Sequence, residues 1–107
     1  MNNILLCCAA GMSTSLLVRK MEDEAKIKGI EVKIWAIGET DIYNNIDLAD
    51  VILLGPQVRY RLTEVKELCK PKNIPVELVN TVDYGLMNGK KVLEHALKLI
   101  GDSKAIK

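Results

Sequence analysis

The chain has 107 residues, enough for one compact domain and too few for two, so we expect a single domain over residues 1–107. About half of the residues are apolar, with one Trp and no Phe, so the core must consist mainly of aliphatic side chains. Fifteen basic and 14 acidic side chains nearly cancel, which argues against general electrostatic binding to nucleic acid or to an anionic membrane.

The sequence carries no sign of a membrane segment. No apolar run approaches the roughly 20 residues needed to span a bilayer, and the first residues lack the positive segment of a signal peptide. We therefore expect a cytoplasmic protein without direct membrane insertion, in which cysteines stay reduced. No metal site is predicted, because structural zinc usually needs four well-spaced ligands and the chain offers only Cys7, Cys8, Cys69 and His95.

Short apolar runs alternate with longer amphipathic stretches along the chain. Strands are predicted at residues 4–8, 31–37, 51–54 and 76–79. Helices are predicted at residues 13–28, 57–70 and 90–100, with a short helix at 41–46. Ser13 or Thr14 can cap the first long helix, Gly29 can end it, and Pro71 can stop the second.

This alternation indicates the α/β fold class, with helices on both faces of a parallel sheet and right-handed crossovers. We predict a single four-stranded parallel sheet of order 2-1-3-4. In that order the carboxyl ends of the first and third strands border the topological switch point, where ligands bind in such sheets. Residues 8–15 and residues 55–57 are expected to meet there.

The segment of residues 8–15 has the composition of an anion-binding loop. Small side chains let backbone N–H groups approach an anion, and a helix N-terminus adds unpaired N–H groups and a partial positive charge. Hydroxyl groups can donate further hydrogen bonds, from Ser13, Thr14 and Ser15. The same field stabilises a thiolate at Cys8, which would be a nucleophile for phosphorus. Cysteines are also often buried for packing, so position and composition alone leave both interpretations open.

The placement of basic residues bears on the chemistry. Small α/β tyrosine phosphatases carry an Arg at the sixth residue after the nucleophilic Cys, whereas here that residue is Thr14 and the nearest basic residue is Arg19. Without a guanidinium to stabilise phosphoester cleavage, the loop favours a phosphoryl carrier over a phosphatase. Asp83 remains a candidate general acid, so a small cysteine-dependent phosphatase or an arsenate-reductase-like enzyme is the alternative.

Two other functions are open from the residues. A thiol redox protein would use Cys7 and Cys8, but adjacent cysteines form a strained ring and the Cys-x-x-Cys spacing is missing. A binding module that only holds an anion predicts that Cys8→Ser changes nothing.

Three segments together carry a family resemblance. The segment from Cys8 to Val18, with Lys20 and Met21 behind it, resembles the active-site segment of the lactose/cellobiose-type IIB family of the phosphoenolpyruvate-dependent sugar phosphotransferase system. Residues 51–57 resemble the family's second signature, and Tyr84-Gly85 with Asn88-Gly89 resembles a third. The resemblance runs nearly end to end, and the length resembles the free-standing cellobiose or chitobiose subtype.

The resemblance implies a phosphotransferase whose only covalent intermediate is a transient phosphocysteine, without a cofactor. A phosphohistidine on a IIA protein would donate to Cys8. Cys8 would pass the group to a sugar, such as cellobiose, chitobiose or a related disaccharide, during uptake through a membrane IIC permease. The phosphoryl oxygens would be held by Ala9, Ala10, Gly11, Met12, Ser13, Thr14 and Ser15, in a phosphatase-like loop after the first strand.

Other residues have a functional and a structural interpretation. Possible rim residues are Gly55, Pro56, Gln57 and Tyr84, which could equally shape a turn, cap a helix or pack. The thiol of Cys7 should point to the opposite face of its strand from Cys8, into the core. Cys69 is expected to pack, and His95 to be a solvated surface residue. Met12 is hypothesised to form part of an apolar docking surface for IIA and IIC.

Overall fold

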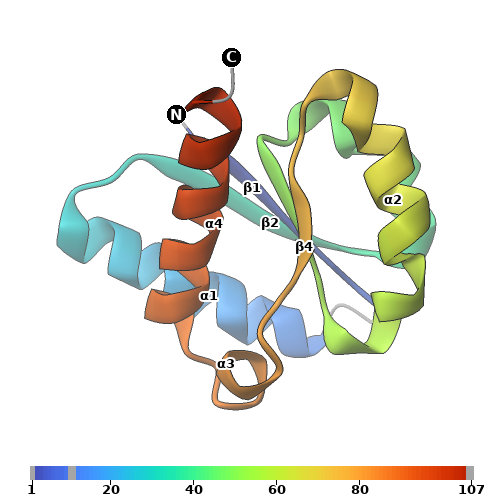
Figure 1. Ribbon diagram of the computed structural model, residues 1–107. Coiled ribbons are helices and arrows are strands. Elements are labelled where there is room, and N and C mark those ends of the chain that lie inside the picture. Colours follow the sequence, from blue (N-terminus) through green and yellow to red (C-terminus); the bar gives the residue numbers. More distant parts are fainter. Residues whose placement is uncertain (1, 10–11, 106–107) are drawn as a thin grey trace.

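The computed structural model describes the backbone of residues 2–9 and 12–105, and the side chains of residues 2–9 and 15–103. Its four strands form one parallel sheet of order β2-β1-β3-β4 (Figure 1). The strands are β1 (Asn2–Cys8), β2 (Val32–Gly38), β3 (Val51–Leu54) and β4 (Val76–Leu78). The predicted fold class and strand order are confirmed.

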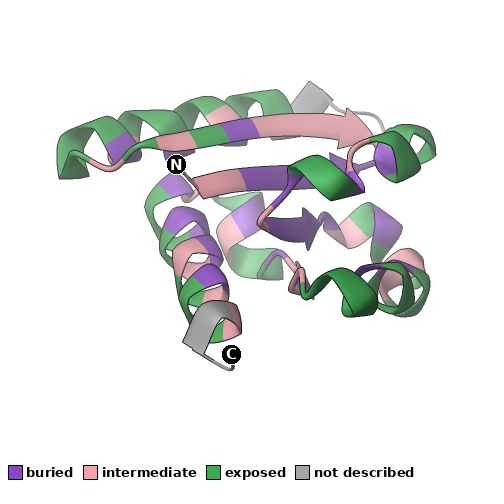
Figure 2. Ribbon diagram, turned by 90° about the horizontal axis from the view of Figure 1, so that it is seen from above, coloured by how far each residue is buried: buried purple, intermediate pink, exposed green. Residues whose placement is uncertain are grey.

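Burial across the sheet follows the apolar runs of the sequence. Every residue of β3 is buried, as expected for a parallel strand that is covered on both faces. From Ile4 to Cys8 β1 is also buried, whereas β2 lies at an edge of the sheet and is mostly half-buried (Figure 2). The central position of β1 places its last residue between the ends of two neighbouring strands.

Two helices cover one face of the sheet. They are α1 (Met12–Lys28) and α4 (Gly89–Ala105), and they enclose an aliphatic core between themselves and the strands. This α1/α4 core contains Ile4, Leu6, Val51 and Leu53 from the sheet, with Leu17, Met21, Ala25, Val92, Leu93, Ala96 and Ile100 from the helices.

The opposite face is covered by α2 (Leu62–Cys69) and by 3₁₀ turns. These turns are η1 (Glu39–Asn44), η2 (Ile46–Leu48), η3 (Pro56–Arg61) and η4 (Lys70–Lys72). The α2 core contains Leu5, Cys7, Ile52 and Leu54 from the sheet, with Ile42, Ile46, Val58, Val65 and Cys69 from the covering segments. Cys69 therefore packs as expected.

Three predicted helices differ from the structure in detail. The first begins at Met12, so Ser13 and Thr14 lie inside it rather than at its cap, and the cap prediction is wrong. Residues 41–46 form 3₁₀ turns rather than an α-helix. Residues 57–70 divide into η3 and α2, and inside η3 Val58 leaves helical backbone angles (φ −118°, ψ 22°) while its side chain is fully buried.

Helix ends follow the sequence signals more closely. Gly29 has φ +68°, and the Ile30 N–H donates to the Ala25 carbonyl at 2.9 Å, as in a glycine-terminated helix. The α2 helix ends at Cys69, before Pro71. A helix that was not predicted, α3 (Thr81–Gly85), begins where the Asn80 side chain accepts from the N–H groups of residues 82 and 83. Among the residues described, no helix combines the length and apolar character needed to cross a bilayer.

Candidate functional site

Cys8 ends the central strand β1 and lies between the ends of two other strands. It is paired in register with Gly38 at the end of β2, and the Gly55 N–H donates to the carbonyl of Cys7 at 2.8 Å. Because side chains alternate along a strand, Cys8 faces the same side as Leu6, toward α1 and α4. Its side chain is only 2% exposed. The residues predicted to meet at the switch point, Cys8 and the turn after β3, do meet there.

A glycine lies where the turn after β3 meets Cys8. A Cβ atom at position 55 would lie 3.4 Å from the Cβ of Cys8 and 3.1 Å from Oε1 of Gln57. Gly55 has ordinary extended backbone angles (φ −67°, ψ 159°), and 3.4 Å is an ordinary contact distance, so neither backbone freedom nor space at Cys8 requires a glycine here. At Gly38, on the other side of Cys8, the nearest atom to such a Cβ would be 3.9 Å away.

The side chains of Cys7 and Cys8 lie on opposite faces of β1. The Cys7 side chain lies in the α2 core, which confirms its predicted core position. Burial raises the pKa of the Cys7 thiol to about 11, with further increases from the charges of Cys8 and Glu39 and a smaller decrease from Arg61. Cys7 is thus protonated at neutral pH, and only the thiolate is a strong nucleophile.

The predicted anion-binding loop is described only in part. Ala9 is exposed, and Ser15 is exposed on the first turns of α1. Ala10 and Gly11 lie outside the described residues, as do the side chains of Met12, Ser13 and Thr14. Their phosphate-binding role stays a prediction. The described backbone does place the start of α1 four residues after Cys8, where unpaired N–H groups of a helix are found.

The predicted rim residues occupy different environments. Pro56 is half-buried and Gln57 exposed at the start of η3, whose N-cap is Gly55, so Gln57 does not cap that turn. Tyr84 is 7% exposed and packs in the α1/α4 core, as in its structural interpretation. Asp83 is half-buried in α3. Whether any of them touches a bound group stays a prediction.

One glycine of the third signature serves helix packing. A Cβ atom at Gly89 would lie 2.6 Å from the backbone carbon of Lys20 and 2.7 Å from the backbone nitrogen of Met21. The first residue of α4 thus touches the backbone of α1, with Asn88 capping α4 through its side-chain oxygen (3.2 Å to the Lys91 N–H). Sequence reasoning noticed this glycine but not its function.

A polar cluster at the same end of the molecule was not predicted. The Arg61 Nε donates to Glu39 Oε1 at 2.9 Å, and the hydroxyl of Tyr60 donates to the same carboxylate. Arg61 Nη1 also lies 3.4 Å from the hydroxyl of Tyr43 and from the carboxylate of Glu64, and Tyr43 donates to Glu64. The hydrogen bonds from Tyr60 and then Arg61 hold the pKa of Glu39 below its ordinary value.

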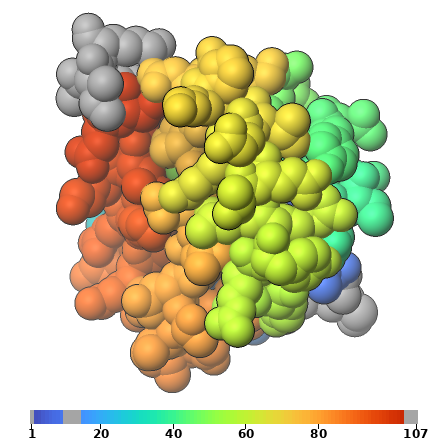
Figure 3. Space-filling model, turned by 45° about the vertical axis from the view of Figure 1, so that its right-hand side comes forward, coloured from blue at the N-terminus to red at the C-terminus, as the bar shows by residue number. Residues whose placement is uncertain are grey.

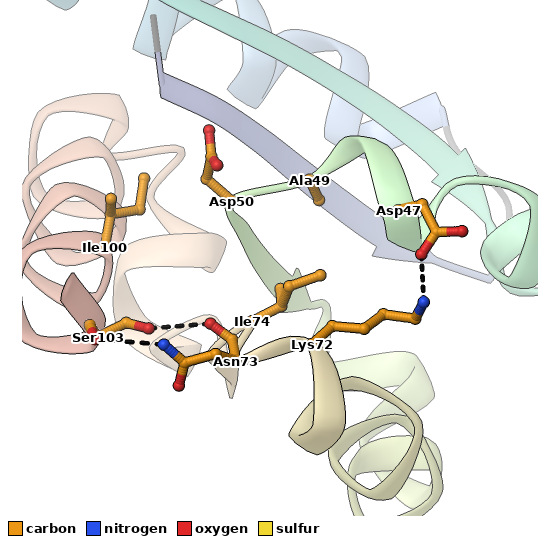
Figure 4. A pocket seen from close by; sticks show the side chains of 8 residues that line it. All are labelled: Asp47, Ala49, Asp50, Lys72, Asn73, Ile74, Ile100 and Ser103. Carbon is orange, nitrogen blue, oxygen red and sulfur yellow. Dashed lines mark hydrogen bonds and ion pairs between the residues drawn. The ribbon is translucent and has the colours of Figure 1, made fainter. Parts of the chain in front are cut away.

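A cavity at the opposite edge of the sheet is not connected with Cys8. It lies where β3 begins, and two pairs of its polar residues bind each other (Figure 4). Lys72 pairs with Asp47 at 2.5 Å, and Ser103 Oγ donates to the carbonyl of Asn73 at 2.9 Å. Its volume of about 260 Å³ is below the roughly 300–1,000 Å³ of most ligand pockets. We place the candidate site at Cys8 because of its position at the switch point of the sheet, and not because of a cavity volume.

Comparison with known proteins agrees with the fold described above. A family model described as "PTS system, Lactose/Cellobiose specific IIB subunit" matches residues 3–95. The chain belongs to this family. IIB components of this phosphotransferase system are phosphotransferases that act in sugar uptake with IIA and IIC components, and this IIB chain is one of them.

Individual relatives cover nearly the whole IIB chain. It is 42% identical over 100 residues to the oligo-beta-mannoside-specific EIIB component of Bacillus subtilis, covering 94% of this chain and 97% of that protein. It is also 42% identical over 102 residues to the cellobiose-specific EIIB component of Lactococcus lactis, covering 91% and 94%.

Solved structures give the same result. A cellobiose-specific phosphotransferase IIB component from Borrelia burgdorferi is 49% identical, with a TM-score of 0.80 over 95% of this chain and 94% of that one. The lactose-specific IIB domain from Streptococcus pneumoniae is 21% identical, with a TM-score of 0.82 over 91% and 95%, and supports the fold alone.

Proposed function

We propose that Cys8 is the residue that carries the phosphoryl group in this IIB protein. The observation that carries the proposal is its position: the last residue of the central strand, at the switch point of the sheet, four residues before the start of α1. Cys7 is the other nearby thiol, but its side chain lies on the opposite face of β1, in the α2 core, and its pKa is raised to about 11.

The transfer consists of two displacements at phosphorus. In the first, the thiolate of Cys8 forms an S–P bond as the N–P bond of a IIA phosphohistidine breaks, and the nitrogen keeps the electron pair. In the second, a sugar hydroxyl forms an O–P bond as the S–P bond breaks, the thiolate is regenerated and the hydroxyl proton leaves to a base or to water. Neither step requires a cofactor, because the protein supplies positioning and charge stabilisation.

For the sugar, we propose cellobiose, chitobiose or a related disaccharide, delivered by a IIC permease. The cellobiose-specific names of the Lactococcus and Borrelia relatives support this class. The oligo-beta-mannoside-specific relative supports a β-linked sugar of the same general kind.

The donor IIA protein should dock on the end of the molecule where Cys8 lies. A phosphohistidine can reach Cys8 only if its protein covers that end. Exposed apolar side chains follow the carboxyl ends of the strands there, between 46% and 70% exposed: Leu16, Tyr60, Val82 and Leu86. The segments η3 (yellow-green) and α3 (orange) both reach the lower end of the surface in Figure 3. Met12 stays a predicted member of this docking surface.

The decisive test is intact mass after incubation with phosphoenolpyruvate, the general phosphotransferase enzymes and a cognate IIA. One phosphate should appear on the wild type and on Cys7→Ser and be absent from Cys8→Ser. If an active IIA leaves the wild type without phosphate, the proposal is wrong. Hydrolysis of an aryl phosphate by the wild type and not by Cys8→Ser would then favour the phosphatase alternative.

A further inference from the structure

The ion pair between Glu39 and Arg61 joins the two segments that lie beside Cys8. Glu39 directly follows Gly38, the register partner of Cys8, and begins η1. Arg61 ends η3, which begins directly after Gly55. Both turns contact β1. The pair therefore crosses the end of β1, on the α2 side of the sheet, while Cys8 faces the other side.

The pair is held in one geometry by several partners. Its two side chains are only 20% and 21% exposed, which is unusual for charged groups. Glu39 accepts from Tyr60 as well as from Arg61, and Arg61 also contacts Tyr43 and Glu64. Neither charge is free to turn toward bulk solvent without breaking two or more of these contacts.

The charges of Glu39 and Arg61 have opposite effects on the pKa of Cys7, at the end of β1. Glu39 raises the pKa of Cys7 and Arg61 lowers it, so each charge is felt by the residue next to Cys8. A phosphorylated cysteine carries about 1.5 to 2 negative charges, against one on the free thiolate. Loading Cys8 therefore makes the end of β1 more negative, and a balanced pair leaves that change neither favoured nor opposed.

We propose that the Glu39–Arg61 pair balances the charge beside Cys8 and thereby sets how strongly Cys8 holds the phosphoryl group relative to the IIA donor. This inference rests on the proposed phosphorylation of Cys8. A carrier must accept the group from one partner and release it to another, so neither a strongly positive nor a strongly negative surrounding suits it. Glu39 and Arg61 act here as positioning residues, since neither is required to touch the phosphoryl group.

Charge balance makes the two single substitutions act in opposite directions. Arg61→Gln leaves the Glu39 carboxylate uncompensated and should lower the ratio of phosphorylated IIB to phosphorylated IIA at equilibrium. Glu39→Gln removes one negative charge, leaves Arg61 paired with Glu64 alone and should raise that ratio. Each change should be on the order of threefold, because a charge at the protein surface acts through a high effective dielectric constant. A merely structural pair predicts the same direction for both, because each substitution breaks the same contact.

The experiment measures this ratio by intact mass in mixtures of phosphorylated IIA with wild-type IIB, the two single variants and Glu39→Gln/Arg61→Gln. The double variant should return to within about twofold of the wild type, because one positive and one negative charge are removed together and the net charge at this place is unchanged. The control is Glu94→Gln, which breaks an ion pair of the same 2.9 Å length with Lys28 at the far end of α1 and should leave the ratio unchanged.

The outcomes separate the two proposals. Absence of phosphate on wild-type Cys8 refutes the proposed function itself. Normal loading of the wild type, with both single variants shifted in one direction or not at all, refutes the charge balance alone. If Arg61→Gln does not fold, as judged by its thermal unfolding, Glu39→Gln decides by itself, because only charge balance predicts a gain. A ratio at or below the wild-type value would then overturn the inference.

Discussion

Replacing Gly89 by Ala tests the contact between the two helices that cover one face of the sheet. The new Cβ would lie 2.6 Å from a backbone carbon of α1, against the 3.4 Å at which ordinary contact begins, so the helices must separate by roughly the 0.8 Å difference. The neighbouring atoms belong to the backbone of Lys20 and Met21, which cannot rotate away as a side-chain end would.

The expected loss of stability follows from two opposing effects. Overpacking of this kind destabilises a fold by about 1–3 kcal/mol. The higher helix propensity of alanine offsets up to about 1 kcal/mol in a helix interior and less at a first helical residue. The net effect should be a loss of about 1–2 kcal/mol, which lowers the Tm of a domain of this size by about 4–10 °C.

The matched control is Gly101→Ala in the same helix. Gly101 is exposed, and nothing lies within 4 Å of its would-be Cβ. Here only the propensity term remains, so stability should rise by up to about 1 kcal/mol. Urea unfolding followed by circular dichroism measures both variants. If Gly89→Ala is as stable as the wild type, the close approach of α1 and α4 is refuted.

Three further predictions concern the end of β1 and the surface around it. The free energy of unfolding should fall as pH rises from about 9 to about 11, because folded Cys7 keeps a proton that the unfolded chain releases. Urea titrations at a series of pH values measure this fall, and Cys7→Ala should make the free energy of unfolding depend less on pH. Gly55→Ala adds a Cβ 3.4 Å from that of Cys8, which is an ordinary contact distance, so the rate of phosphorylation of Cys8 in timed mass measurements should stay within about twofold of the wild type, as it should for Gly38→Ala; a severalfold loss in Gly55→Ala alone would contradict this. Leu86→Asp should lower the rate of phosphoryl transfer from IIA about tenfold and leave the Tm unchanged. The control is Ile27→Asp, at an exposed position at the far end of α1, which should leave the transfer rate unchanged. If the two variants accept phosphate at the same rate, α3 is not part of the docking surface.

The sequence was most informative where a single physical effect decides the structure. Residues 51–54 are uninterrupted aliphatic residues, and only a strand covered on both faces suits four consecutive buried side chains. The strand order predicted from the sequence then places Gly55 beside Cys8, because the carboxyl ends of adjacent parallel strands lie at one edge. Fold and candidate nucleophile were therefore within reach of sequence reasoning.

The sequence was least informative where contacts between residues far apart in the chain determine the structure. The helix predicted from residue 57 is interrupted at Val58, which is fully buried in the α2 core at non-helical angles. The five residues of α3 are too few to show a helical period. The pairing of Glu39 with Arg61 joins positions 22 apart and depends on two turns that pack over β1, so no local pattern could reveal it.

The three sequence signatures act on the same site by different means. The first supplies Cys8 and the second supplies Gly55, which lies against it. The third acts at a distance, because Gly89 sets how closely α4 approaches α1 at Lys20 and Met21, two turns into the helix that begins just after Cys8. A shift of α1 at this contact moves its N-terminus relative to β1. Gly89→Ala should therefore slow phosphorylation of Cys8 as well as lower the Tm, whereas Gly101→Ala should change only the Tm.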